Sequence, residues 1–244
     1  MFSKQFSRTL HTTLCYCKNV KLKNFKGKGA SSAQWLTRQL SDPYVDKAKM
    51  MNYRCRSAFK LVEMDDRFKF LSPGQIVIDC GAAPGSWTQV AVKRVNADNS
   101  KENAPFGTVI SIDKQQIYPI MGATILGNSD FTTASTQDKI KTLLENKKVD
   151  TVLSDMAPNA TGVKDMDDEN IINLCYSVLR FAVLVSNIDA TLVVKLWQSN
   201  YTKTLENDML HFYKTVKTVK PQASRSDSAE IFLLAREFKG LKCS

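Results

Sequence analysis

Short apolar runs alternate with segments of helical periodicity along most of the chain. Runs with the length and composition of buried strands lie at residues 76–80, 108–112, 123–126, 151–154 and 191–196. Apolar positions recur at helical spacing in residues 54–70, 86–95, 135–146, 168–185 and 202–212. This alternation predicts βαβ crossovers, and therefore an α/β fold with a mostly parallel sheet and helices on both faces.

The end of the chain follows a different pattern. Residues 216–219 and 230–236 read as two strands separated by the turn-forming residues P-Q-A-S-R-S-D-S, with no helix between them. We therefore expect a hairpin and an antiparallel C-terminal strand. Residues 96–106 are rich in Asn, Asp, Ser and Lys and are predicted to form a surface insertion.

Composition supports one folded domain. The chain has 244 residues, and its 43% hydrophobic and 24% charged content excludes a wholly disordered or collagen-like protein. The longest apolar stretch, residues 178–194, is interrupted by Arg180, Asn187 and Asp189, so we expect no membrane insertion. Six scattered cysteines without a C-x-x-C pair, together with only two histidines, predict no metal site and a reducing compartment.

Positive charge is concentrated at the N-terminus. The formal net charge is +10, but residues 1–41 hold eight basic and no acidic residues, so the remaining 26 basic residues nearly balance 24 acidic ones. Residues 1–18 combine basic, hydroxyl-bearing and apolar side chains, which is typical of a mitochondrial transit peptide, although a retained basic arm has a similar composition. We expect a basic lead-in at residues 19–34 and the folded domain at residues 35–240.

A glycine turn follows the first predicted strand. The segment D-C-G-A-A-P-G-S-W begins at Asp79 and leads directly into a helix, and Gly81 and Gly85 allow the tight turn at which open α/β sheets bind ligands. The spacing is not the dinucleotide pattern, and Pro84 lacks an N–H that a pyrophosphate would use, which argues against NAD. We therefore expect a nucleoside-containing ligand at this turn.

Two acidic residues after later strands suit the same ligand. Asp113 ends the second strand and can hold a ribose diol, while Asp130 follows the third strand and can accept from an adenine amino group. Capping of a helix or hydration of a loop explains either acid equally well when it is taken singly.

Four further polar residues stand at positions of chemical interest. Asp155 follows the fourth strand within S-D-M-A-P-N-A-T-G, and Lys195 lies in the apolar strand V-V-K-L-W, where burial of a charge is unfavourable. Lys60 lies in the helix before the first strand, and Glu230 opens the last strand. Taken alone, these two would read as a solvated helix lysine and an edge-strand charge.

Together these segments resemble the FtsJ/RrmJ family of S-adenosylmethionine-dependent ribosomal RNA 2′-O-methyltransferases, and specifically its mitochondrial branch. The resemblance rests on R-C-R-S-A-F-K-L from Arg54, the glycine turn, S-D-M-A-P-N-A-T-G, V-V-K and K-P-Q-A-S-R-S-D-S-A-E, and it covers most of residues 35–238. It departs from the family pattern at K-Q-Q after Asp113 and at Asn128-Ser129 before Asp130.

The resemblance implies a Rossmann-like methyltransferase fold and a set of site residues. The implied catalytic residues are Lys60, Asp155, Lys195 and Glu230. The implied contacts to S-adenosylmethionine come from Ala83, Pro84, Gly85, Ser86, Trp87, Asp113, Asp130 and Asp155. The implied substrate is a uridine in large-subunit rRNA, free or within the assembling mitochondrial large ribosomal subunit, and the implied location is the mitochondrial matrix.

Ribose methylation requires removal of a weakly acidic proton from an acceptor held close to the methyl donor. Burial, the neighbouring charge of Lys60 and the sulfonium of the cofactor all disfavour a charged Lys195, so we expect its amine to be the general base. Asp155 and Glu230 are expected to orient the lysines and the target ribose.

Basic residues lead from the N-terminal segment towards the helix that bears Lys60, and they can contact the phosphates of an RNA: Lys21, Lys23, Lys26, Lys28, Arg38, Arg54 and Arg56.

Two other functions are alternatives to ribose methylation. Methylation of a base nitrogen is disfavoured because D-M-A-P stands where such enzymes resemble N-P-P-Y. A non-catalytic RNA-binding assembly factor is less favoured because all four polar residues are present.

Overall fold

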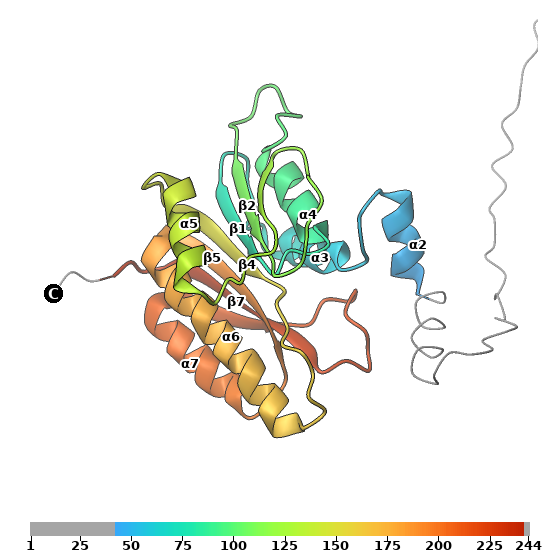
Figure 1. Cartoon of the computed structure of the whole chain (residues 1–244), viewed down its shortest axis with the longest axis vertical. Helices are drawn as coiled ribbons and strands as arrows, with labels where there is room; N and C mark the ends of the chain where they lie inside the picture. The colour runs from blue at the N-terminus through green and yellow to red at the C-terminus, as the bar shows by residue number, and fades with distance from the viewer. Residues whose placement is uncertain (1–41, 242–244) are drawn as a thin grey trace, which may run out of the picture.

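A seven-stranded sheet forms the centre of the protein (Figure 1). The computed structural model describes residues 42–241. The predicted transit peptide at 1–18, the basic lead-in at 19–34 and the predicted start of the domain at residue 35 lie outside these residues.

The strands are β1 (Ile76–Cys80), β2 (Thr108–Ile112), β3 (Ala123–Leu126), β4 (Val149–Ser154), β5 (Ser186–Trp197), β6 (Tyr213–Val219) and β7 (Glu230–Phe238). Their order in the sheet is β3-β2-β1-β4-β5-β7-β6. The first five are parallel to one another, whereas β7 is antiparallel to both β5 and β6. The predicted parallel sheet with an antiparallel C-terminal member is therefore confirmed.

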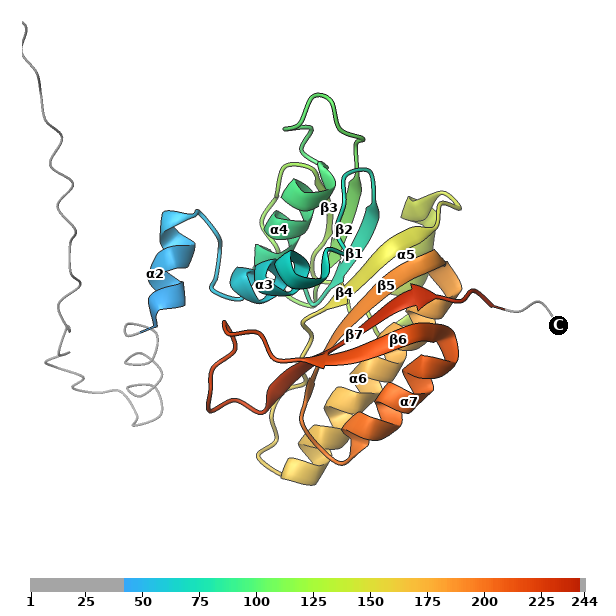
Figure 2. The same ribbon diagram turned by 180° about the vertical axis from the view of Figure 1, so that it is seen from behind.

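The helices are α2 (Pro43–Met50), α3 (Ala58–Phe68), α4 (Ser86–Val95), α5 (Ala134–Leu144), α6 (Lys164–Val185) and α7 (Tyr201–Phe212). Figures 1 and 2 show α3 and α4 on one face of the sheet and α5, α6 and α7 on the other. Because side chains alternate along a strand, Val193 of β5 packs in the core with α3 and α4, while Leu192 and Val194 pack in the core with α6 and α7. The prediction of helices on both faces is confirmed.

Several elements differ from the sequence prediction; among them, β4 begins at Val149 rather than at residue 151 and β6 at Tyr213 rather than at residue 216. Helix α2 was not predicted, although Asp42 caps its first turn by accepting from the Tyr44 N–H at 3.0 Å and Pro43 begins it. Helix α3 begins at Ala58 rather than at residue 54. Strand β5 begins at Ser186, before the apolar run predicted from residue 191. The polar residues Asn187 and Asp189 interrupt the apolar pattern in this exposed part of the strand.

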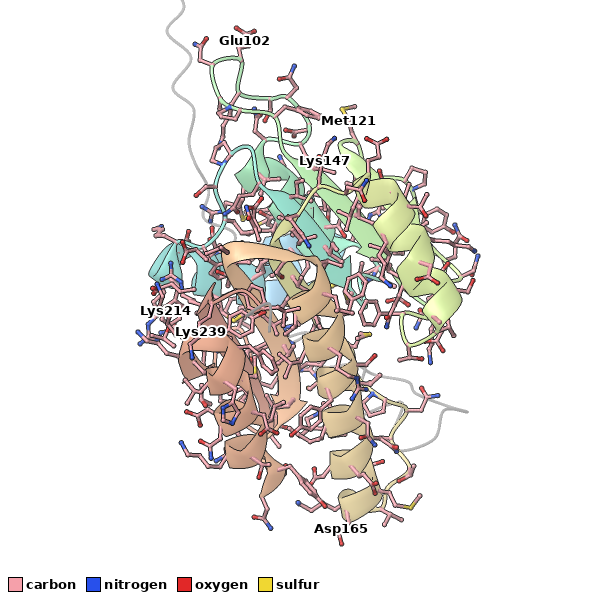
Figure 3. All side chains as sticks on the ribbon, turned by 90° about the vertical axis from the view of Figure 1, so that its left-hand side faces the viewer. Glu102, Met121, Lys147, Asp165, Lys214 and Lys239 are labelled. Atoms are coloured by element: carbon pink, nitrogen blue, oxygen red, sulfur yellow. The ribbon has the colours of Figure 1, made fainter. Side chains whose placement is uncertain are left out.

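The predicted surface insertion lies far from the carboxyl ends of the parallel strands. In Figure 3, Glu102 of this loop and Met121 lie at one end of the molecule, and Asp165 in the first turn of α6 lies at the other. The base of the loop is anchored by the buried side chain of Asn96, which donates to the carbonyls of Lys101 and Ala104 at 3.1 and 3.0 Å.

Within residues 42–241, the structure contains no helix with the length and hydropathy needed to cross a bilayer.

Candidate active site

Sheet register brings the four predicted catalytic residues to one region. Asp155 directly follows β4, and Lys195 lies near the end of the neighbouring strand β5. In the antiparallel pair β5 and β7, Lys195 lies opposite Phe232 and Trp197 lies opposite Glu230. Helix α3, which carries Lys60, packs on the face of the sheet that includes Phe232.

The four residues form two ion pairs. The Lys195 Nζ lies 2.9 Å from Asp155 Oδ1 and also donates to the Asp155 main-chain carbonyl. The Lys60 Nζ lies 2.7 Å from each carboxylate oxygen of Glu230. All four side chains are between 11% and 17% exposed, so the pairs are largely shielded from water and hold their geometry better than surface pairs do.

The first pair bears on the prediction for Lys195. Its Nζ, which the sequence predicted to be the general base, lies in direct contact with the Asp155 carboxylate. Asp155 and Glu230 each contact one lysine. The base role of Lys195 and the orienting roles of the two acids stay predictions.

The glycine turn passes very close to the segment after β4. Gly81 has φ +78°, and a Cβ at this position would lie 2.5 Å from Met156 Cγ and 2.9 Å from the Met156 nitrogen. Backbone conformation and space therefore both require glycine here. Sequence reasoning did not identify Met156, although it directly follows Asp155 in the S-D-M motif.

Arg54 fastens this turn from outside. Its guanidinium donates to the main-chain carbonyls of Pro84, Tyr118 and Pro119, each at 2.8 Å. The sequence analysis grouped Arg54 with residues that follow RNA phosphates, but its donors hold the loop before β3 against the turn. The sequence could not predict this role, because every residue has a main-chain carbonyl and the identity of the side chain does not show which carbonyls are bonded.

A cavity of about 840 Å³ opens beside the turn. Its volume lies within the range of pockets that take small molecules. Four of the predicted cofactor contacts line it, namely Ala83, Asp113, Asp130 and Asp155. Hydroxyl or amino groups of a nucleoside can donate to the three carboxylates among them. Lys114 and Arg180 also line the cavity, so its charge is mixed. The residues present therefore fit the nucleoside part of S-adenosylmethionine.

The other four predicted contacts lie in the turn and the start of α4, outside the cavity lining. Trp87 is only 2% exposed; its Nε1 donates to the Ser57 carbonyl at 2.8 Å, and its ring lies 5.6 Å from that of Phe232. Ser86 is buried against the Ser57 hydroxyl at 2.7 Å. Cofactor contacts from Pro84, Gly85, Ser86 and Trp87 stay predictions.

Both acids beyond the turn also make local contacts. Asp113 accepts from the N–H groups of Ala83 and Gln115 at 2.9 and 2.7 Å. Asp130 accepts from Thr132 and pairs with Lys114 at 3.0 Å. Burial opposes ionisation of Asp130, but these contacts outweigh it and lower its pKa. The loop-capping explanation therefore holds for both acids, which also face the cavity.

Asp79 lies beneath the turn and is completely buried. Its pKa is raised to about 7, mainly by burial and in part by the negative charges of Asp155 and Asp113, while the hydrogen bond that Thr88 Oγ1 donates at 2.7 Å opposes the shift. Because this folded-state pKa lies above the ordinary value of 3.8, protonated Asp79 stabilises the fold at low pH, and that contribution is lost as the pH rises towards 7.

The side chain at position 79 in Asp79→Asn stays neutral at every pH. The free energy of unfolding of this variant, taken relative to that of the wild type, should therefore increase by about 2 to 3 kcal/mol between pH 5 and pH 8. Denaturant unfolding of both proteins across this range measures the difference, and other titrating groups cancel in the comparison. Two stability curves that run parallel from pH 5 to pH 8 would contradict the assignment. Among residues 42–241, no three His, Cys, Asp or Glu side chains are grouped to hold a metal ion.

Comparison with known proteins shows the family to which the chain belongs. The model of the FtsJ-like methyltransferase family matches residues 53–238. The chain is 57% identical over 237 residues to rRNA methyltransferase 2, mitochondrial, from Drosophila melanogaster, covering 96% of this chain and 94% of the relative. It is 44% identical over 221 residues to ribosomal RNA large subunit methyltransferase E from Cereibacter sphaeroides, covering 91% and 90% of the two chains.

A solved structure has the same fold. A Plasmodium falciparum chain, solved as a ribosomal RNA methyltransferase, superimposes with a TM-score of 0.68 at 31% identity, covering 78% of this chain and all of that one. Family match, sequence identity and fold agree with the resemblance drawn from the motifs. The chain belongs to the FtsJ-like methyltransferase family.

Proposed function

We propose that this protein transfers a methyl group from S-adenosylmethionine to the ribose 2′-hydroxyl of a uridine in mitochondrial large-subunit rRNA. The observation that carries the proposal is the pair of lysine–carboxylate contacts, Lys60 with Glu230 and Lys195 with Asp155, together with the cavity that Asp155 lines. The similar Drosophila protein is a mitochondrial rRNA methyltransferase, and the bacterial relatives act on large-subunit ribosomal RNA.

The cofactor would supply a methyl group on a positively charged sulfur, held by the cavity that Gly81, Asp113 and Asp130 line. As an uncharged amine, Lys195 would accept the proton of the ribose hydroxyl on Nζ while the cofactor supplies its methyl group to the ribose oxygen. Asp155 then stabilises the ammonium that forms, because its carboxylate is already in contact with that nitrogen.

The second pair has a different task. Both oxygens of Glu230 contact the Lys60 Nζ, which fixes the position of that nitrogen. Lys60 held in this way can donate to the ribose oxygen and stabilise the negative charge that develops there.

Residues 1–18 are proposed to direct import into the mitochondrial matrix, and the basic residues at 19–34 to add affinity for RNA that depends little on sequence. The composition of the segment and the mitochondrial name of the Drosophila relative support this location. Fusion of residues 1–34 to a fluorescent protein tests it, because a fusion that stays outside mitochondria would contradict import.

The function is tested with labelled S-adenosylmethionine and mitochondrial large ribosomal subunits from cells that lack the protein. We expect methyl transfer to one uridine in the large-subunit rRNA and none to small-subunit rRNA. The same RNA with deoxyuridine at the mapped position is the matched control, because it lacks only the accepting hydroxyl. Continued methylation of that control would show base methylation, and binding without transfer would show an assembly factor; either result contradicts the proposal.

A further inference from the structure

The loop between β6 and β7, residues 220–229, reaches across to the helices on one side of the sheet. Figure 2 shows it projecting towards α2 and α3, and it ends at Glu230, the first residue of β7. A loop of this kind would be mobile if only its ends were held. In this protein the centre of the loop is also anchored, and the path of the loop determines where the Glu230 side chain lies.

Ala223 is the point at which this loop is docked. Its N–H donates to Glu63 Oε2 at 3.0 Å, and its carbonyl accepts from the Arg56 guanidinium. Ala223 is fully buried, so its N–H and carbonyl bond to charged side chains on or near α3 instead of to water. The second carboxylate oxygen of Glu63 accepts from the Tyr44 hydroxyl at 2.9 Å, which ties α2 into the same arrangement.

The next residue transmits this position to Glu230. The Ser224 hydroxyl donates to Glu230 Oε1 at 2.8 Å, and the serine is only 6% exposed. The same carboxylate contacts the Lys60 Nζ with both oxygens at 2.7 Å. Glu230 is therefore held between a neutral donor from its own loop and a charged donor from α3, and Ser224 restrains the rotation that would carry the carboxylate away from Lys60.

We propose that Ser224 is a positioning residue of the methyltransferase, which holds the Glu230 carboxylate in the orientation that fixes Lys60. This inference rests on the proposed function, because it assigns Lys60 and Glu230 to the reaction. Ser224 itself touches neither the cavity lining nor the proposed base. Its effect should therefore fall on the chemical step and leave the binding of cofactor and RNA unchanged.

The test compares Ser224→Ala with Ser226→Ala, which removes an exposed hydroxyl from the same loop. We expect kcat to fall by about 10- to 100-fold in Ser224→Ala, the size expected for loss of a hydrogen bond to a charged group, with KM for RNA and Kd for S-adenosylmethionine changed by less than about threefold. Ser226→Ala should match the wild type. Ser224→Thr retains the hydroxyl and should restore kcat to within about threefold of the wild type.

A double variant separates this role from a general effect on the loop. In a Glu230→Ala background, Ser224→Ala should cause no further loss of kcat, because the group that Ser224 orients is gone. Additive losses would overturn the inference, as would an alanine variant with wild-type kcat. Equal losses in the alanine and threonine variants would overturn it too.

A spectroscopic measurement keeps this result separate from the function itself. In nitrogen-edited NMR spectra of lysine ammonium groups, the Lys60 signal should shift in Ser224→Ala and stay unchanged in Ser226→Ala. A Lys60 signal unmoved in Ser224→Ala overturns the positioning role whether or not the protein is active. Absence of methyl transfer by the wild type on its RNA substrate overturns only the proposed function.

Discussion

Replacing Lys195 with alanine is expected to abolish methyl transfer while cofactor binding stays near the wild-type value. The proposed base is the Lys195 Nζ, and a positioned general base contributes on the order of 10²- to 10⁴-fold to a rate, so we expect a fall of about 10³-fold or more. The cavity walls include Asp155 but not Lys195, so the binding surface keeps its shape. Transfer of labelled methyl groups to RNA and calorimetric titration with S-adenosylmethionine measure the two quantities.

Loss of positive charge could weaken RNA binding and imitate loss of the base. Lys203→Ala is the matched control, because Lys203 is an exposed lysine on α7, 72% exposed and paired only with Glu206 of its own helix among the described contacts. The control should retain wild-type turnover and show the same loss of net charge. Turnover by Lys195→Ala within about tenfold of the wild type would remove Lys195 from the chemistry.

Strands β1, β2 and β3 were predictable, although β3 is not buried. Their predicted bounds match the structure, since turn residues or a change of polarity flank each apolar run. The prediction was less accurate where a strand continues beyond its apolar run. Strand β5 extends through residues 187–189, which face solvent, and β6 begins at Tyr213, three residues before the predicted run. Hydrogen bonds to a neighbouring strand extend these elements without a hydrophobic signal.

The edge that carries the site was also predictable, because the carboxyl ends of parallel strands meet there. Asp155 and Lys195 follow from their positions at the ends of β4 and β5. Their pairing did not follow from position. Lys60 and Glu230 are 170 residues apart in sequence and lie on a helix and an antiparallel strand, so only the packing of α3 against β7 brings them into contact.

Partners of main-chain groups were the least predictable part of the site. Arg54 binds three carbonyls around the glycine turn, and Ala223 is docked through its amide N–H and carbonyl. Neither contact needs a particular residue type on the carbonyl side. Sequence reasoning therefore placed Arg54 with the RNA-binding residues and gave no role to the loop before Glu230.

Replacing Gly81 with alanine is expected to weaken cofactor binding by about 10²-fold or more and to lower stability by about 2 to 4 kcal/mol. A left-handed conformation costs a residue with a Cβ roughly 1 to 2 kcal/mol, and the methyl group would also lie 2.5 Å from Met156 Cγ. Relief of that contact must move Met156, which lines the cavity beside Asp155. Calorimetric titration with S-adenosylmethionine and denaturant unfolding measure the two losses.

Gly162→Ala isolates the backbone contribution. Gly162 has φ +84°, close to the +78° of Gly81, but a Cβ at this position would meet no atom within 4 Å. The control should therefore lose only the roughly 1 to 2 kcal/mol of left-handed strain and keep wild-type cofactor affinity. The additional losses in Gly81→Ala then measure the close approach of the turn to Met156. If both variants bind S-adenosylmethionine equally well, the glycine turn is not part of the cofactor site, and the cavity beside it must serve another ligand.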